Sequence, residues 1–207
     1  MHALIVVSHP EKKSLTHSVA TAIASGITSS SQHSADIADL TAEGFNPTFT
    51  AQDFAAFKLT DPVPTDIVAE QARIDKADAL VLVFPVYWWS MPALLKGWID
   101  RVFTNGWAYE ENAEGGVVKK LGRLPVHIIG LGAASQGAYD RHGFTAAFNA
   151  QIAHGIFDYC GAQVKTSELL LLPELGSGEA YLDKGRTLGE QVFGGGEKTA
   201  FGEESFE

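Results

Sequence analysis

Short apolar runs alternate with longer segments of helical period along most of the chain. The apolar runs are rich in Val, Ile and Leu, which is typical of strands buried on both faces of a parallel sheet. They span residues 3–7, 35–40, 79–84, 126–131 and 164–172. The helical period predicts helices over residues 14–29, 65–76, 92–104 and 141–160, with a weaker pattern over 179–193. This alternation is that of repeated β–α–β units.

The order of these elements predicts an α/β fold. Five parallel strands with helices on both faces form a doubly wound, flavodoxin-like sheet, whose usual strand order is 2-1-3-4-5. A chain of 207 residues has room for one such domain, which we place at residues 1–193. Two irregular segments, residues 42–64 and 106–123, are expected to form functional loops. Residues 194–207 begin with three glycines and continue with several acidic residues, so we expect a mobile tail.

Composition and charge narrow the functional classes. Apolar residues make up 45% of the chain and charged residues 19%, as in a soluble protein with a packed core. The formal net charge of −10 gives no general attraction to nucleic acid or to an anionic membrane. Cys160 is the single cysteine, which excludes an intrachain disulfide and a cysteine-rich metal site and favours the cytoplasm. We expect no bound metal, and no run approaches the roughly 20 apolar residues that would span a bilayer.

The loop after the first strand is the first candidate site, because ligands of a doubly wound sheet bind beyond the carboxyl ends of the strands. It leads into a helix whose free N–H groups and dipole favour an anion, and Ser14 and Thr16 add hydroxyl donors. The loop contains neither G-x-G-x-x-G nor G-x-x-x-x-G-K-[ST], which weakens a Rossmann or nucleotide-hydrolase interpretation. We expect a flavin phosphate here; the alternative is that Ser14 only caps the helix.

An aromatic cluster follows the third predicted strand. Tyr87, Trp88 and Trp89 are adjacent and lie between Pro85 and Pro92, so they cannot all face a core. Aromatic surface beside a rigid backbone suits a planar isoalloxazine ring, which needs stacking and N–H donors near its N5 and O4 atoms. The alternative is an aromatic plug that covers the end of the sheet.

The loop after the fourth strand, residues 130–139, has small residues that allow a backbone to approach a ligand closely. Tyr139 and His142 follow within one helical turn of each other. A phenol and an imidazole at this place can donate to negative charge on a reduced flavin or on a bound quinone. A structural role for both side chains is the alternative.

The chain resembles the NAD(P)H:quinone oxidoreductases of the DT-diaphorase type. The resemblance covers most of the chain up to the fifth strand. The densest matches are Asp66-Ile67-Val68-Ala69-Glu70-Gln71, Phe84-Pro85, Trp88, Leu95-Lys96-Gly97-Trp98 and Arg101-Val102-Phe103. Further matches are Phe45-Asn46-Pro47, His142-Gly143 and Cys160-Gly161.

The resemblance implies a bound FAD, with FMN as the alternative, and NADH or NADPH as the electron donor. Matched by position, the first four of the following residues would hold the phosphates and the others would line or contact the ring. They are His9, Ser14, Leu15, Thr16, Pro85, Val86, Tyr87, Trp88, Trp89, Gly132, Ala133 and Tyr139. Tyr139 and His142 resemble the family's tyrosine and histidine that stabilise the charge of the reduced flavin, which makes them the expected catalytic pair.

The resemblance also implies a homodimer with an active site at the subunit interface. Tyr109 looks like one of two tyrosines that gate the family's pocket across this interface, and Trp88 would line the same substrate pocket. The position of the second tyrosine is Glu111, which makes the acceptor pocket more polar. The expected reaction is two-electron hydride transfer from NAD(P)H through the flavin to a quinone by a ping-pong mechanism.

Three other functions agree with parts of the pattern. An azo dye or a nitroaromatic compound could accept electrons from the same flavin. A one-electron carrier like flavodoxin would expose a flavin edge to partner proteins, but the aromatic run and the segment that carries Tyr109 argue against it. A regulatory flavoprotein subunit of a membrane transporter is the third alternative.

Overall fold

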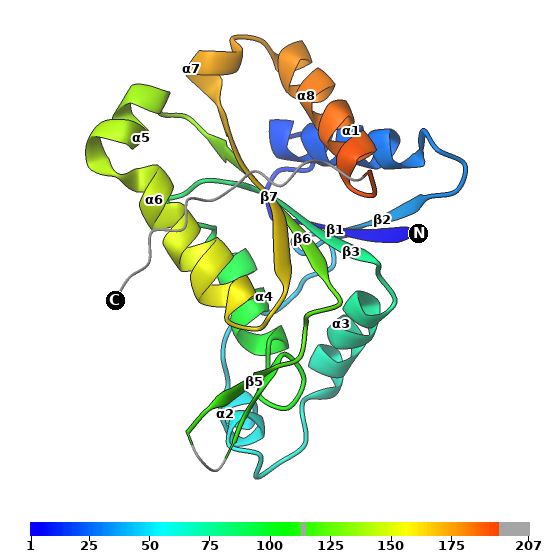
Figure 1. Ribbon diagram of the computed structural model, residues 1–207, viewed down its shortest axis with the longest axis vertical. Coiled ribbons are helices and arrows are strands. Elements are labelled where there is room, and N and C mark those ends of the chain that lie inside the picture. The colour runs from blue at the N-terminus through cyan, green and yellow to red at the C-terminus, as the bar shows by residue number, and fades with distance from the viewer. Residues whose placement is uncertain (113–114, 195–207) are drawn as a thin grey trace.

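The five predicted strands form one parallel sheet, and the predicted order is confirmed. The computed structural model describes residues 1–112 and 115–194 of the chain. Along the sheet the order is β2-β1-β3-β6-β7, which is order 2-1-3-4-5 of the five parallel strands. Their bounds are β1 His2–Val7, β2 Ser34–Asp39, β3 Ala79–Pro85, β6 Pro125–Gly132 and β7 Gln163–Leu171 (Figure 1).

Helices cover both faces of the sheet, as the sequence predicts. Ala3, Ile5 and Val7 of β1 face a core that also contains residues of α1 and α8, whereas Leu4 and Val6 face residues of α3, α4 and the last helices before β7. This alternation follows from the two-residue side-chain period of a strand. The helices are α1 Leu15–Thr28, α2 Ala51–Phe57, α3 Thr65–Asp75, α4 Ala93–Val102, α5 Gln136–His142, α6 Phe144–Phe148, η1 Asn149–Asp158, α7 Leu172–Leu175 and α8 Gly178–Gln191.

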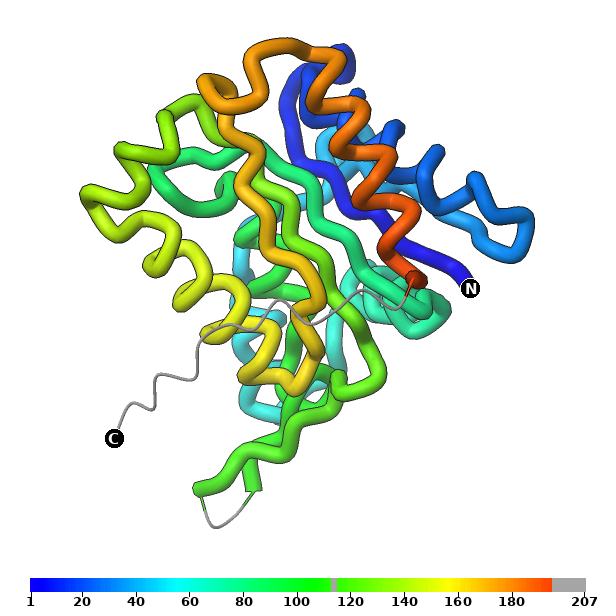
Figure 2. Tube along the Cα trace, turned by 45° about the horizontal axis from the view of Figure 1, so that its top comes forward, coloured from blue at the N-terminus to red at the C-terminus, as the bar shows by residue number. Residues whose placement is uncertain are grey.

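The two segments expected to be irregular contain regular structure. Helix α2 lies in the first, and its amino end is stabilised by a capping box in which Thr50 and Asp53 bond each other's backbone N–H. An antiparallel hairpin of β4 Tyr109–Glu111 and β5 Val117–Lys119 lies in the second. Figure 2 shows this hairpin at one end of the molecule, beyond the body of the sheet.

The single helix expected over residues 141–160 begins earlier and is divided. Gly143 has a φ of +67°, a left-handed conformation that ends α5 and lets the chain turn into α6. The following η1 is a π-helix, a rare form that is frequent near functional sites. The last strand ends at Leu171, one residue before its predicted end, because Pro173 lies in the first turn of α7.

Helix α1 is held in place by an unusually close contact with α8. A Cβ at Gly26 would lie 2.1 Å from the Arg186 carbonyl oxygen, and a Cβ at Gly189 would lie 2.1 Å from the Ile23 carbonyl oxygen. Only glycine permits the two backbones to approach so closely. The contact fixes the axis of α1, and so the direction in which its amino end points.

No helix among the described residues is long and apolar enough to cross a membrane. Apart from Gly194, the expected acidic tail at residues 194–207 lies outside the described residues.

Candidate active site

The three loops expected to bind a ligand lie at one edge of the sheet. Val7 pairs with Asp39 and with Val83, so the carboxyl ends of β2, β1 and β3 are aligned. From these ends α1 packs on one face of the sheet and α4 packs on the other. Figure 2 shows the loops after β1 and β6 at the end of the molecule opposite the β4–β5 hairpin. The switch point, at which doubly wound folds bind ligands, therefore lies at this edge of the sheet.

The amino end of α1 is prepared for an anion. Ser14 is the N-cap and accepts from the His17 N–H at 3.3 Å. Within the described chain, the backbone N–H groups of Leu15 and Thr16 have no acceptor. His9 accepts from the Glu11 N–H through Nδ1 at 3.0 Å, which leaves its Nε2 as a donor. Two amides and an imidazole N–H thus accompany the positive end of the helix dipole.

The sequence predicted Ser14 as a site residue, but not the two residues that are hydrogen-bonded in series with it. Ser14 Oγ lies 2.8 Å from His17 Nδ1, and His17 Nε2 lies 2.9 Å from Asp39 Oδ2. Asp39 Oδ1 also accepts from the N–H groups of Thr41 and Ala42, each at 3.1 Å. Burial alone would raise the pKa of the Asp39 carboxyl, but the hydrogen bonds from Ala42, His17 and Thr41 outweigh it and hold that pKa below 3.8.

Trp88 and Trp89 form the tip of a strained two-residue turn. Tyr87 and Ser90 exchange backbone hydrogen bonds of 2.9 and 3.0 Å, and the φ angles of Trp88 and Trp89 are +50° and +65°. A left-handed backbone costs roughly 1–2 kcal/mol for a residue with a side chain, and such strain is concentrated at ligand sites. The Trp88 side chain is 93% exposed, and neither tryptophan N–H has a backbone acceptor among the described residues. The turn therefore presents aromatic surface together with free backbone donors.

Trp89 connects the aromatic turn to the helix that carries Tyr139 and His142. Its ring stacks on Phe144 with centroids 3.8 Å apart and meets Tyr139 edge-on at 5.5 Å. The His142 ring stacks on Phe144 as well, with the two ring centroids 5.2 Å apart. Tyr139 is only 1% exposed, and burial raises the pKa of its phenol, whereas His142 is exposed. The structure thus brings the two expected catalytic residues to one aromatic cluster, one beneath it and one at its rim.

Gly132 lies in a tightly packed position at the end of β6. A Cβ on Gly132 would lie 2.8 Å from Tyr139 Oη and 2.8 Å from Leu171 Cδ2. The neighbouring loop is held close, because the Val86 N–H donates to the Leu131 carbonyl at 2.8 Å. Ala133 follows and is exposed. Gly132 itself is buried, and the absence of a side chain there lets Tyr139 and Leu171 pack against its backbone, so the exposed position beside the aromatic turn is Ala133.

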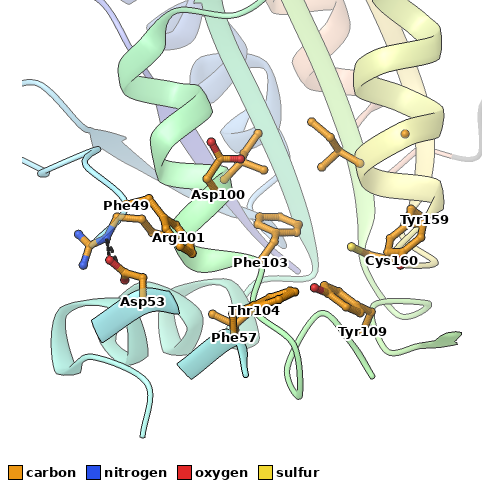
Figure 3. A pocket seen from close by; sticks show the side chains of 13 residues that line it. Phe49, Asp53, Phe57, Asp100, Arg101, Phe103, Thr104, Tyr109, Tyr159 and Cys160 are labelled. Carbon is orange, nitrogen blue, oxygen red and sulfur yellow. Dashed lines mark hydrogen bonds and ion pairs between the residues drawn. The ribbon is translucent and has the colours of Figure 1, made fainter. Parts of the chain in front are cut away.

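Tyr109 is not near these loops in the single chain. It lies at the start of β4, at the opposite end of the sheet, and its ring meets Tyr159 edge-on at 5.4 Å. Both tyrosines line a pocket of about 380 Å³, across from Phe49, Asp53 and Arg101 (Figure 3). Burial and the charge of Glu111 raise the pKa of the Tyr109 phenol. One chain therefore does not assemble Tyr109 and Trp88 into one pocket.

The carboxyl edge can bind a flat, partly apolar ligand that ends in an anion. The anion fits the amino end of α1, and the flat part fits the Trp88–Trp89 turn beside the exposed Ala133. A flavin nucleotide has this shape and these groups, so the residues present fit the expected cofactor.

Comparisons with known proteins agree with this description. The pattern that defines the flavodoxin-like fold family matches residues 1–171. NAD(P)H dehydrogenase [quinone] 1 of Cavia porcellus is 30% identical over 190 residues, which cover 81% of this chain and 67% of the relative. The structure of the NAD(P)H:quinone oxidoreductase from Methanothermobacter marburgensis superimposes with a TM-score of 0.82 and 25% identity, covering 93% of this chain and 98% of the other. A potassium-efflux ancillary protein of Enterobacter is 42% identical over 107 residues, which cover 52% of this chain and 58% of the relative.

Proposed function

Because the chain belongs to the flavodoxin-like fold family, we propose that it is an NAD(P)H:quinone oxidoreductase that works through a bound flavin. When bound, the flavin supplies a carrier that takes a hydride from NAD(P)H and gives it to a quinone. The observation that carries the proposal is the meeting of an anion site and a strained, exposed aromatic turn at one edge of the sheet.

Some residues of this edge bind the flavin, and others stabilise the charge that develops on it. His9 Nε2 and the amides of Leu15 and Thr16 bind the phosphate part, while Thr16, which is 2% exposed, contributes through its backbone. The N–H groups of Trp88 and Trp89 donate to the ring, and the indoles exclude water from it. His142 donates to the negative charge that develops during hydride transfer, and the buried Tyr139 packs against Gly132 and holds the end of β6 in place.

We propose FAD as the cofactor, with FMN as the alternative. The support is the resemblance of the whole chain to the FAD-binding quinone reductases. Purified protein should be yellow, and chromatography of the flavin released by denaturation distinguishes the two. FMN would withdraw the FAD assignment and leave the chemistry in place, whereas a colourless protein that binds neither flavin would overturn the function.

The kinetic test is the pattern of initial rates. NAD(P)H and quinone are proposed to bind in turn on the same surface, so double-reciprocal plots at several fixed concentrations of a benzoquinone should be parallel. Intersecting lines would show that both substrates bind together and would contradict the shared pocket. The same assay with an azo dye and a nitroaromatic compound compares the alternative acceptors directly.

We propose that the active protein is a homodimer in which Tyr109 of one subunit completes the site of the other. The support is the separation of Tyr109 from Trp88 within one chain and the exposed aromatic rings of Phe49, Phe57 and Tyr159 around the Tyr109 pocket. Sedimentation should report two chains. Mixed dimers of Trp88→Ala and Tyr109→Ala subunits should recover one intact site, although each variant alone is impaired; no recovery would place both residues in the same subunit's site.

A second function, regulation of a membrane transporter, is favoured by the relative that is a potassium-efflux ancillary protein. Purification of the chain from membranes of its native cells tests this function. Stable retention of the chain by a transport protein would support this function, provided that detergent washing removes the chain from a control membrane.

A further inference from the structure

His17 occupies a bridging position at the proposed phosphate site. Its Nδ1 lies 2.8 Å from Ser14 Oγ, and its Nε2 lies 2.9 Å from Asp39 Oδ2. The charged or titratable groups that face it are Asp39 at the end of β2 and the His9 ring in the preceding loop, whose centroid is 6.2 Å away. Its side chain and that of Asp39 are 15% and 19% exposed, so the pair is partly shielded from solvent.

The Ser14 hydroxyl has a single hydrogen, so it can donate either to His17 or to a phosphate, but not to both. A serine hydroxyl has one hydrogen to donate and two lone pairs to accept with. Since Asp39 only accepts, His17 Nε2 carries a proton, and in the neutral ring Nδ1 is then an acceptor. The Ser14 hydroxyl must donate its one hydrogen to Nδ1, and its lone pairs face the His17 N–H. With a neutral His17, Ser14 has no hydrogen left for a phosphate.

Protonation of His17 reverses the direction of this hydrogen bond. Nδ1–H then donates to Ser14 Oγ, which frees the hydroxyl hydrogen to point toward an anion at the amino end of α1. The imidazolium would also lie between two negative groups, the Asp39 carboxylate and the bound phosphate, and opposite charges within a few ångströms favour the charged form. The direction of the hydrogen bond and the neighbouring charges therefore both favour a protonated His17 when a phosphate is bound.

We propose that this protein binds its flavin phosphate with His17 protonated, so that binding takes up a proton and weakens as the pH rises. The proposal rests on the proposed function, because it assumes that a flavin phosphate occupies the α1 amino end. His17 is a positioning residue: it acts on the phosphate through Ser14.

The molecule contains a matched trio without such a site. His2 Nδ1 lies 3.0 Å from Ser34 Oγ, and His2 Nε2 lies 3.7 Å from Asp36 Oδ2, at the amino end of the strands. The same three residue types thus meet there, at the amino ends of β1 and β2 and away from the amino end of α1. His2→Gln is the control substitution for His17→Gln.

Calorimetry of flavin binding measures the proton directly. The full chain, freed of flavin, is titrated with FAD at pH 7 in two phosphate-free buffers of different ionisation enthalpy. FAD is the probe because its phosphates are diesters, whereas the monoester of FMN titrates near pH 6 itself. The dependence of the observed enthalpy on the buffer gives the number of protons taken up. Riboflavin, which has the same ring and no phosphate, is titrated in parallel.

The wild-type chain should take up a fraction of a proton, approaching about one at high pH, with FAD but not with riboflavin. Its FAD affinity should fall by up to about tenfold per pH unit above the range in which histidine titrates. His17→Gln should abolish the uptake and lower FAD affinity at pH 6 by about tenfold, while His2→Gln matches the wild type. Asp39→Asn, which keeps the acceptor for Thr41 and Ala42, should reduce the uptake as well.

The outcomes separate the two proposals. If neither flavin binds to the wild type, the proposed function fails. If FAD binds without proton uptake, or if His17→Gln retains the uptake, the function stands and the role of His17 is overturned. If His17→Gln does not fold, as judged by its melting temperature and riboflavin binding, Asp39→Asn decides: unchanged uptake in that variant contradicts the proposal.

Discussion

The two ends of the central sheet contain the same kinds of side chain and use them differently. At the amino end His2 contacts Ser34 and Asp36, His127 contacts Thr166, and Tyr109 packs on Tyr159. At the carboxyl end a serine, a histidine and an aspartate also meet, but they lie beside a helix amino end with free N–H groups. The carboxyl end therefore differs from the amino end in having backbone N–H donors at the start of α1 that have no acceptor among the described residues.

Left-handed backbone occurs near both ends of the sheet, and at the amino end it is Leu59, with a φ of +57°. The carboxyl end contains the left-handed pair Trp88 and Trp89, with Trp88 almost fully exposed. At the amino end Arg101 is buried and donates from Nε to both oxygens of Asp53 at 3.1 Å. The carboxyl end is thus distinguished by an exposed aromatic turn beside N–H groups that have no acceptor in the described chain, and the amino end by a buried ion pair.

The largest effect is expected at the carboxyl end, for His142→Ala. Loss of one preorganised donor to developing charge should slow flavin reduction by NAD(P)H by about 10²-fold in stopped-flow measurements. Flavin content and melting temperature should change little, because the side chain is exposed. His154→Ala, an exposed histidine on η1, is the control. A parent rate in His142→Ala would make His142 a packing residue and leave the charge to the backbone N–H groups.

A histidine at the amino end should affect stability and not catalysis. Burial, followed by the charge of Lys165, lowers the pKa of His127 from 6.5 to about 4. The neutral form is therefore favoured in the folded protein, and stability is complete above pH 6.5 and declines as the pH falls toward 4. His127 should lower the free energy of unfolding by about 2 kcal/mol at pH 5 relative to pH 8.

Denaturant unfolding at both pH values checks this expectation. His127→Leu should remove this part of the pH dependence, whatever its effect on stability at pH 8. An unchanged slope between pH 8 and pH 5 would show that another group is responsible.

Tyr109→Ala tests whether the amino end of one subunit serves the carboxyl end of another. The KM for quinone should rise by roughly 2- to 12-fold, as expected for the loss of one aromatic contact of about 0.5–1.5 kcal/mol. Flavin content should stay the same, and Tyr109→Phe should retain most of the affinity. Equal losses of flavin and of acceptor binding would indicate that Tyr109 supports the fold and does not gate the pocket.

The smallest effect concerns the strained turn. Trp88→Gly removes a side chain that packs on little and relieves a φ of +50°, so it should stabilise the folded chain by up to about 1 kcal/mol. Turnover should fall, because the indole is lost. Trp88→Ala keeps the strain and should not show the stabilisation. A lower melting temperature for Trp88→Gly would mean that the exposed indole contributes to the fold of the single chain.

Part of the candidate site could be predicted from the sequence because its residues lie in the loops that follow strands. Ser14 and the Trp88–Trp89 pair each follow a buried apolar run, and the ends of parallel strands meet at one edge. His17 gave no such signal, since it lies inside a helix and its partner Asp39 is 22 positions away. A polar residue at the carboxyl end of β2, next to the switch point, is the sign that could have suggested Asp39.

Helix α2 was predicted as loop although its sequence contains a signal for it. Thr50 and Asp53 have the spacing of a capping box, and the structure shows both of its bonds. The helix is short, and its periodicity is too weak to stand out beside Pro47, Pro62 and Pro64. Its position depends on the buried contact between Asp53 and Arg101, 48 residues apart, which no local pattern contains.

The sequence by itself determined the parallel sheet and its order, and so the edge at which we propose that a ligand binds, because apolar periodicity records burial and chain connectivity restricts topology. Only the tertiary structure decided which polar groups at that edge have partners. Hydrogen-bond direction at Ser14 depends on a helix and a strand meeting at 2.8 and 2.9 Å. The separation of Tyr109 from Trp88 likewise follows from α4, which carries the chain from one end of the sheet to the other. Such distances result from packing between remote segments and leave no period along the chain.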